Sequence, residues 1–454
     1  MANAGTPEWW LDRLYKKLRA RQPQIKTYDK WYSGEHPAPE GYPQADELIR
    51  RLLDTLGLNI LPRLSDAGVE RMQVEGFNVN GKNNDDIWKI WQGNNFDAAS
   101  QMVLQEKGAL SESYVLVDPN LNAAGVPTMT PEHPEQAYVE QLPASQGRMG
   151  LKVYVDDTGD VPLRYAYVLG ADEISVYAAP TRSGSGWALR PSWEFQESLS
   201  GSNPLDECPL VPFTNRPRML REPRPEWWPA LRIQRRINKT LMDRMAMQDE
   251  GAFKALWASG LDIPEDENGK AVQPFRRAID RMMVNENPEG KFGQFEADDI
   301  RQMLLAVKDD VMAGAIVVPT PPDQFLGEIV NVSEGGLEAA RDSLTRRVNL
   351  HKMYDGESFE TVARLTLRAA GKESPSAAAM TTNWVDLENA TEGAKADAAV
   401  KWSSLRVPDE ALWEKFLGAT PEQIKLWKAA SDEQLSRESA VGVKAVRDAA
   451  SGGV

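Results

Sequence analysis

The chain has 454 residues, 41% of them hydrophobic, and a net charge of −15, values typical of a folded protein with two or three domains. Such an acidic chain is not expected to bind nucleic acid or an anionic membrane tightly, because Lys and Arg supply most of that affinity. No apolar run reaches the roughly 20 residues of a membrane helix, and the amino terminus lacks the apolar core of a secretion signal. These features predict a cytoplasmic protein without a membrane partner.

The first part of the chain is predicted to be mainly helical. Apolar residues recur there at the spacing of amphipathic helices, and two short alternating runs separate them. The predicted helices are residues 7–20, 45–56, 85–92 and 98–110, and the predicted strands are residues 73–79 and 113–118. The pattern then changes: in residues 136–213, short alternating runs separated by Gly, Pro, Asp and Ser predict a block of β-hairpins.

A long amphipathic helix is predicted at residues 228–257, after a Pro- and Arg-rich hinge at residues 215–229. Its apolar row is Leu231, Ile233, Ile237, Leu241 and Met245. The basic side chains around this row are Arg232, Arg235, Arg236, Lys239 and Arg244. Because acidic residues outnumber basic ones in the chain, ion pairing of these side chains is favoured over contact with nucleic acid, which stays the alternative.

A second central helix is predicted at residues 297–312. Its apolar side consists of Ile300, Leu304, Val307 and Val311. Between the two central helices, a turn at residues 287–290 separates two short predicted strands, residues 281–284 and 291–295. The sequence therefore predicts two long helices joined by a small β insertion.

The last third of the chain is also predicted to be helical. Residues 314–332 interrupt the pattern, because Pro319, Pro321 and Pro322 remove backbone donors. A helix then begins near Ser333 and its pattern continues to Gly371, a residue type that often ends a helix in the left-handed conformation. Shorter helical units follow, one of them starting with a capping box at residues 420–423.

The sequence carries no recognisable catalytic motif: it holds no P-loop, no His-Glu-x-x-His and no cysteine pair. The single cysteine, Cys208, precedes an apolar run and is interpreted as buried and structural. Four aspartate pairs are candidates for a two-metal nuclease, although a solvated surface is the favoured interpretation of each. These pairs are Asp85-Asp86, Asp156-Asp157, Asp298-Asp299 and Asp309-Asp310. The sequence therefore predicts neither an enzyme nor a cofactor or metal.

Seven segments, in order along the chain, carry a likeness to one protein family. The most specific are TPPDQFLG at residues 320–327 and NVSEG at residues 331–335. The others are residues 28–37, 69–77, 211–216, 237–241 and 286–295. Together they resemble the portal proteins of tailed double-stranded-DNA bacteriophages, particularly those of actinobacterial siphophages. One departure is the apolar run at residues 314–319.

The resemblance implies an α+β, mainly helical portal fold with a wing, a stem, a clip and a crown. Subunits of this family form a ring, usually dodecameric, around a central channel. The implied parts are the wing (residues 1–226 and 333–401), the stem helices (227–257 and 297–313), the clip (258–296), the tunnel loop (314–332) and the crown with the tail (402–454).

The resemblance also implies which residues serve the channel. The tunnel-loop residues expected to face DNA are Gly314, Val317, Val318, Pro319, Thr320, Pro321, Pro322, Asp323, Gln324 and Phe325. The stem charges expected to pair between subunits or to face DNA are Arg232, Arg235, Arg236, Lys239 and Lys308. The clip residues expected to face the terminase or an adaptor are Asp266, Glu267, Asn287, Glu289 and Lys291.

The implied partners are further copies of the chain, the major capsid protein and scaffold, the terminase large subunit, head–tail connector proteins and the DNA in the channel. The implied location is the portal vertex of the virion, reached from the host cytoplasm during assembly. Another virion structural protein, a connector or a minor capsid protein, is the alternative, and a metal-dependent nuclease is less favoured. Connectors are usually much shorter and do not need two long helices around a clip, so length and element order favour a portal protein.

Overall fold

The computed structural model describes residues 3–37, 57–143, 147–181, 191–252, 256–259, 291–294, 300–321, 323–326, 334–385, 399–404, 407–410, 412–413 and 423–431. The predicted helix at residues 45–56 lies outside these ranges. The chain divides into two compact units, Met1–Trp384 and Val385–Val454. None of the helices within the described ranges has the length and apolar character needed to cross a bilayer.

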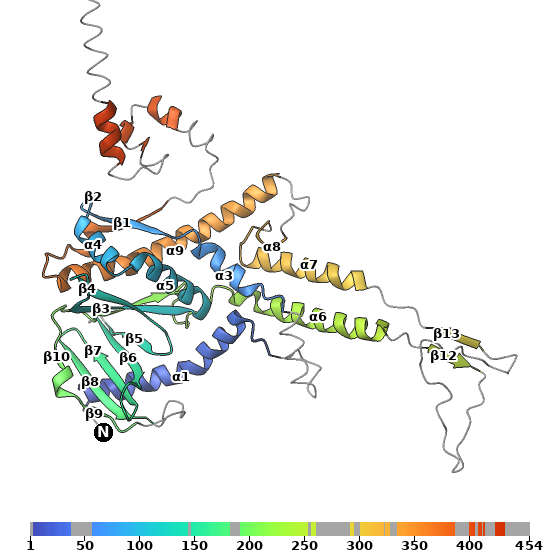
Figure 1. Cartoon of the computed structure of the whole chain (residues 1–454), viewed down its shortest axis with the longest axis horizontal. Helices are drawn as coiled ribbons and strands as arrows, with labels where there is room; N and C mark the ends of the chain where they lie inside the picture. The colour runs from blue at the N-terminus through green and yellow to red at the C-terminus, as the bar shows by residue number, and fades with distance from the viewer. Residues whose placement is uncertain are drawn as a thin grey trace, which may run out of the picture. The chain divides into compact units, whose positions relative to one another are not determined.

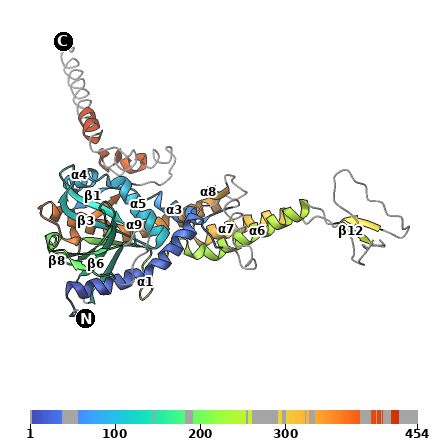
Figure 2. The same cartoon turned by 60° about the horizontal axis from the view of Figure 1, so that its bottom comes forward.

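Helix α1, Pro7–Ser33, runs along one side of a large antiparallel sheet (Figures 1 and 2). The predicted end of this helix at residue 20 is wrong, because the helix continues through Pro23, and Gly34 caps it with a φ of 89°. Pro23 removes one backbone donor, but burial of later apolar side chains offsets that loss. These side chains are Ile25, Tyr28 and Trp31.

The predicted β-rich block is confirmed as a six-stranded antiparallel sheet. Its strands are β5 (Ala137–Gln141), β6 (Arg148–Asp156), β7 (Leu163–Leu169) and β8 (Glu173–Pro180), with β9 (Glu194–Phe195) and β10 (Gly201–Ser202) both paired with β8. The leucine row of α1 (Leu11, Leu14 and Leu18) packs onto this sheet. It shares a core cluster with Leu151 and Val153 of β6.

Two three-stranded antiparallel sheets lie in the same unit. One has the order β11–β3–β4, formed by Leu210–Thr214, Glu112–Leu121 and Pro127–Glu132. The other has the order β14–β1–β2, formed by Met380–Trp384, Val74–Val79 and Lys82–Asn83. Strand β14 is a correction, because the sequence predicts only helices in residues 333–401. It forms by pairing with β1, where Phe77 faces Thr382.

Four helices pack with these smaller sheets around the largest core cluster. They are α3 (Leu61–Val69), α4 (Asp85–Gly93), α5 (Phe96–Leu110) and α9 (Glu334–Ala369). Short 3₁₀ turns occur at η2 (Glu197–Leu199), η3 (Trp228–Ala230) and η4 (Ala377–Ala379). The cluster is centred on aromatic side chains: Phe77, Trp91, Phe96, Phe213 and Phe359. After α9, Gly371 adopts a φ of 67°, as its position in the sequence predicts.

The two predicted central helices are α6 (Leu231–Ala252) and α7 (Ile300–Val317), which lie side by side (Figure 1). Their predicted ends require correction, since α7 continues past residue 312 and Trp257 belongs to a strand. That strand, β12 (Leu256–Ser259), pairs with β13 (Lys291–Gln294). The sequence predicts a different partner for β13, residues 281–284, which lie outside the described residues.

The second unit is helical at residues 399–404 and 423–431. The rings of Trp413 and Trp427 meet edge to face with centroids 5.8 Å apart. Nearby, the Nζ atom of Lys428 lies 2.6 Å from a carboxylate oxygen of Glu410. The capping box predicted at residues 420–423 falls largely outside the described residues.

Candidate functional site

The inward faces of α6 and α7 share one apolar core with α1, α3 and α5. Ile237 and Leu241 of α6 are buried there, together with Val307 and Val311 of α7. Burial of each such side chain stabilises the packing by about 2 kcal/mol. The predicted apolar rows are confirmed for these residues but not for Leu304, whose side chain is half exposed. The helix pair is thus anchored on the rest of the unit through its inward face.

A chain of hydrogen bonds fixes the first turns of α6. The side-chain amide of the buried Gln234 donates to the carbonyl of Leu58 at 2.8 Å and accepts from the backbone N–H of Ile60 at 3.0 Å. One turn later, the Asn238 amide nitrogen lies 2.9 Å from Nδ1 of His36. Burial lowers the pKa of His36 against the opposing effect of its hydrogen bonds. The His36 imidazole is therefore neutral near pH 7. These hydrogen bonds connect the start of α6 to residues that precede α3.

Two of the predicted stem charges form ion pairs within the chain. Nη2 of Arg236 lies 2.5 Å from Oδ1 of Asp310, which joins α6 to α7. Nζ of Lys239 lies 2.5 Å from Oδ1 of Asp243, one turn further along α6. Both acids belong to the same chain. Pairing of the stem charges between subunits, or their contact with DNA, stays a prediction. Asp310 also corrects the interpretation of its aspartate pair as solvated surface, because its side chain is largely buried against α6.

The outward faces of the two helices differ in chemistry. On α6, Arg232 and Arg235 are exposed, and the guanidinium of Arg235 lies 5.4 Å from the centre of the Trp31 ring, a cation–π distance. On α7, Leu305 is 61% exposed and Ile316 is 75% exposed. The pair therefore presents a basic face on one helix and an apolar face on the other.

The segment expected to be a loop facing DNA begins inside α7. Gly314 is buried, and a Cβ atom there would come within 2.9 Å of Cδ1 of Ile60. Val318 and Thr320 are also buried, since the Thr320 hydroxyl donates to the Val318 carbonyl at 2.8 Å and its N–H to the Ala315 carbonyl at 3.0 Å. These three residues are thus buried in the single chain, and their expected contact with DNA stays a prediction.

The other expected tunnel-loop residues have mixed environments. Val317 is the last residue of α7 and is about half exposed. Pro319 is half-buried, Pro321 is buried, and Pro322 lies outside the described residues. The short helix α8 (Asp323–Leu326) contains Asp323, Gln324 and Phe325, and Phe325 packs against the helix-pair core. Lys308 on α7 is half-buried.

Most of the expected clip residues lie outside the described part of the chain. These are Asp266, Glu267, Asn287 and Glu289. Lys291 is described as the first residue of β13, where it lies opposite Ser259 of β12. The pairing of β12 with β13 brings the strand that follows α6 next to the strand that precedes α7.

Comparison of the chain with models of known protein families identifies its family. Residues 11–436 match the family model described as phage portal protein, SPP1 Gp6-like. The chain belongs to this family. The portal protein of Mycobacterium phage D29 is 28% identical to it over 360 residues, which are 75% of this chain and 71% of the relative. The resemblance to portal proteins of actinobacterial phages, inferred from the seven sequence segments, is thereby confirmed.

One solved structure shows a weak similarity to the fold. It is a chain from the neck of a native GTA particle computed with C12 symmetry, with 11% identity and a TM-score of 0.42 over 84% of this chain and 95% of that chain. A likeness of this size carries no argument about arrangement or assembly.

Beneath the start of α6, this portal-family chain buries a network of charges that the sequence did not predict. Nζ of Lys107 lies 2.5 Å from Oδ2 of Asp355 and 3.3 Å from Nδ1 of His351. Nε2 of His351 lies 3.4 Å from Oε2 of Glu226, and Nε of Arg347 lies 3.7 Å from Oε1 of the same carboxylate. Lys107 and Asp355 are 248 positions apart, so no local pattern could have paired them.

The Glu226 carboxylate is the anionic centre of this network. Burial acts to raise its pKa, but His351, Arg347 and Arg216 outweigh that effect and lower the pKa to about 2. The backbone N–H of Glu226 also donates to the carbonyl of Gly108 at 2.8 Å, which joins the segment before α6 to the end of α5. The network therefore links α5, α9 and the base of the helix pair.

In each aspartate pair that lies within the described residues, one member has a partner in the chain, as shown above for Asp310. Asp86 lies at the start of α4 and 2.6 Å from Nζ of Lys372. Asp156 accepts a hydrogen bond from the Thr158 hydroxyl at 2.6 Å. The pair at residues 298–299 lies outside the described residues. Within the described ranges, no three His, Cys, Asp or Glu side chains gather into a group that could hold a metal ion.

Proposed function

We propose that the chain is the subunit of a closed, dodecameric portal ring at one vertex of a phage capsid. Double-stranded DNA enters the capsid through the channel of this ring during packaging and leaves through it during ejection. The observation that carries the proposal is the match to the portal family over residues 11–436. The ring is a component of the virion and assembles in the host cytoplasm.

In this ring, α6 and α7 form the stem, and residues 258–296 form the clip between them. The wing comprises residues 1–226 and 333–401, residues 314–332 form the tunnel loop, and residues 402–454 form the crown and the tail. The clip binds the terminase large subunit during packaging and the head–tail connector proteins afterwards. The wing contacts the major capsid protein and the scaffold.

The charge of the chain supports a conduit for DNA. Duplex DNA carries about one negative charge per 1.7 Å, so a strongly basic channel would retain it. The net charge of the chain is −15. Two of the basic residues of α6, Arg236 and Lys239, are already paired with acids of the same chain. A ring of such subunits lets the duplex slide, because few basic side chains are left to hold its phosphates.

The outward face of α7 supports assembly into a ring. Leu305 and Ile316 are exposed, whereas the opposite side of the same helix is packed against the unit. A helix that is apolar on both sides is normally buried on both sides. A neighbouring copy provides the missing cover, and a contact between two different surfaces closes into a ring when it repeats around an axis.

DNA contact in the tunnel is proposed for those residues whose side chains remain accessible. Val317 at the end of α7 is half exposed, and Lys308 lies on the same helix with a half-buried side chain. Residues 327–332 complete the proposed tunnel loop and lie outside the described part of the chain. The buried Val318 and Thr320 instead anchor the start of that loop.

Electron microscopy and native mass spectrometry of the purified full-length chain test the proposal. We expect closed rings with a central opening and the mass of a dodecamer. The Ile316→Asp variant is expected to lose the rings, because it places a charge in the proposed contact. Asn349→Asp, which adds the same charge at an exposed position of α9, is the matched control. A wild-type chain that stays monomeric, both alone and with scaffold protein, would contradict the proposal.

A further inference from the structure

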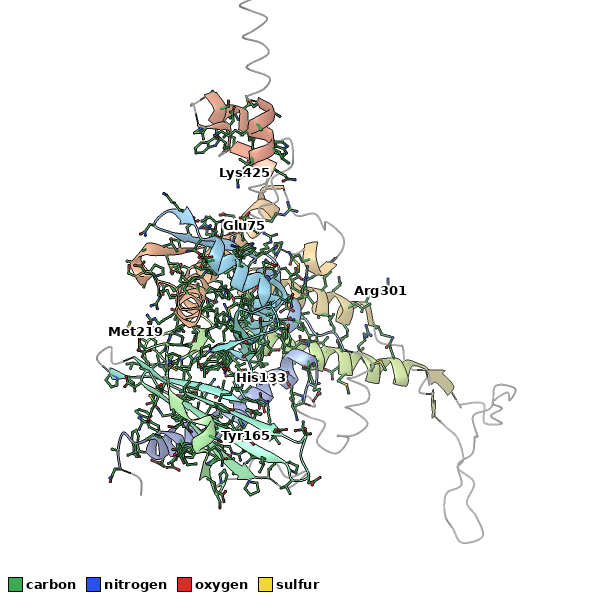
Figure 3. The ribbon with its side chains drawn as sticks, turned by 60° about the vertical axis from the view of Figure 1, so that its left-hand side comes forward. Glu75, His133, Tyr165, Met219, Arg301 and Lys425 are labelled. Carbon is green, nitrogen blue, oxygen red and sulfur yellow. The ribbon has the colours of Figure 1, made fainter. Side chains whose placement is uncertain are left out.

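An apolar tip protrudes between β11 and the start of the helix pair. Its two central residues are Met219, which is 95% exposed, and Leu220, which is fully exposed. Arg218 and Arg221 flank them, and neither forms an ion pair with another residue in the described ranges. Figure 3 shows Met219 at the rim of the unit, clear of Tyr165 on the large sheet. We call these four residues the Arg218–Arg221 tip.

The tip is held in one shape by its base, although the sequence suggested a hinge here. The buried Asn215 donates its side-chain N–H to the carbonyl of Arg224 at 2.8 Å and its backbone N–H to the carbonyl of Ser111 at 2.9 Å. At the tip itself, the N–H of Arg221 donates to the carbonyl of Arg218 at 3.3 Å. The exposed apolar pair is therefore presented on a fixed support.

The backbone conformation of the tip points the same way. Leu220 has a φ of 57°, in the left-handed region that residues other than glycine rarely adopt. Such strain persists only where the surrounding structure imposes it, and it clusters at sites that bind something. Two large apolar side chains displayed in this way are best accounted for by a partner surface that covers them.

A surface that complements the tip lies on the same chain. It consists of β9, which lies at the edge of the large sheet, and the η2 turn that follows it. Phe195 is 52% exposed and Leu199 is 50% exposed. The exposed acids Glu194 and Glu197 lie beside them in the sequence. The ring of Phe195 rests edge to face on Tyr177 of β8, with centroids 5.5 Å apart, which fixes its position. We call this surface the β9–η2 edge.

We propose that the Arg218–Arg221 tip of one copy packs on the β9–η2 edge of the next copy. The proposal rests on the ring assembly of the proposed function and names a contact that would hold its subunits. Two arginines and two apolar side chains of the tip meet two glutamates and two apolar side chains of the edge, so charge and apolar surface match together. A symmetric contact of tip with tip would instead bring four arginines together, which favours the head-to-tail arrangement that builds rings.

Cysteine cross-linking tests this contact directly. The only native cysteine, Cys208, is buried as predicted, and burial raises the pKa of its thiol to about 11, so it does not compete. A chain carrying Leu220→Cys is mixed with a chain carrying Leu199→Cys and oxidised. We expect a disulfide-linked heterodimer. The control is Leu220→Cys mixed with Met102→Cys, an equally exposed position on α5. A yield no higher than that of the control would overturn the proposal.

Charge reversal provides a second, independent test. The Arg218→Glu/Arg221→Glu chain is expected to form roughly tenfold fewer rings than wild type at equal concentration, because like charges then face each other. The Glu194→Arg/Glu197→Arg chain should show the same loss, and a chain carrying all four changes should recover rings. Thermal unfolding should not change, since all four positions are exposed. If the wild-type chain forms rings, the charge-reversal variants assemble fully and no cross-link forms, this contact alone is overturned. If the wild-type chain forms no rings, the proposed function is overturned as well.

Discussion

α6 and α7 are anchored through similar apolar rows, yet their outward faces have opposite chemistry. α6 turns Arg232 and Arg235 towards solvent, whereas α7 turns Leu305 and Ile316 outwards. A charged helix face is stable in contact with water, because water solvates its charges. An apolar helix face is stabilised by being covered, because burial of apolar surface contributes about 25 cal/mol per Å². Of the two helices, α7 therefore carries the apolar surface that a single chain leaves uncovered. We expect assembly of the subunits to bury this surface.

The largest effect on the stability of the single chain is expected from the inward face of the pair. Ile237 has no exposed surface, and Ile237→Ala leaves a cavity where α6 meets the rest of the unit. We expect the free energy of unfolding to fall by about 3 kcal/mol, as is typical of large-to-small changes in a core. Urea unfolding of the purified chain measures this. An unchanged unfolding midpoint would contradict the packing described for α6.

A similar loss is expected where the base of the pair meets the buried charges. Glu226→Gln removes the anion that faces Arg347 and His351, and uncompensated buried charge costs about 3 kcal/mol. Arg346→Ala, which removes an exposed ion pair with Asp342, is the control and should change stability by less than about 0.5 kcal/mol. If both variants unfold at the same urea concentration, the network does not stabilise the fold.

The same carboxylate predicts a dependence on pH. Its folded-state pKa is about 2, below the ordinary value of 4.5 that applies when the chain is unfolded. A lowered folded-state pKa stabilises the fold above the unfolded pKa, and this contribution disappears as the pH falls from about 4.5 through about 2. The stability difference between wild type and Glu226→Gln should therefore shrink in that window. A difference of constant size from neutral pH down to pH of about 2 would exclude Glu226 as its source.

A smaller effect is expected from the ion pair that joins the two helices. The Arg236 side chain is mostly exposed, so solvent screens its attraction to Asp310. A double-mutant cycle with Arg236→Ala and Asp310→Ala should give a coupling of about 0.5–1 kcal/mol. A coupling of zero would show that the two helices are joined by their apolar contacts alone.

The smallest effect on folding, together with a clear effect on assembly, is expected from the outward face of α7. Ile316→Ala should change the free energy of unfolding by less than about 0.5 kcal/mol, because most of this side chain is already exposed. The same change should shift sedimentation profiles from rings towards monomers. Ile237→Ala and Ile316→Ala thus compare one residue type on the two sides of the helix pair. Assembly unaffected by Ile316→Ala would remove this face from the interface.

The spacing of apolar residues along the chain predicted the elements whose buried face follows a regular period. The spacing of Ile237 and Leu241 identified the buried row of α6, and the alternation in residues 136–213 identified the large sheet. The end of α1 was missed because Pro23 normally interrupts a helix, and only burial of Tyr28 and Trp31 against distant residues overrides that preference. Strand β14 was missed for a similar reason, since its partner β1 lies about 300 positions earlier.

The sequence predicted which residue types occur in the candidate site, but not which side chains contact one another there. The sequence shows which helix is basic, but not that Arg236 would find Asp310 on the neighbouring helix. It also marks the prolines after α7, but not that Val318 and Thr320 would fold back into buried positions. The expectation of a loop that faces DNA came from the family resemblance, and it stays a prediction for these residues.

A cryo-electron microscopy map of the assembled ring, at a resolution that shows the side chains of α6 and α7, would show what covers the outward face of α7. We predict that Leu305 and Ile316 are covered by a neighbouring copy, while Arg232 is not buried in an apolar contact. A closed ring in which the outward face of α7 stays in contact with solvent would contradict it.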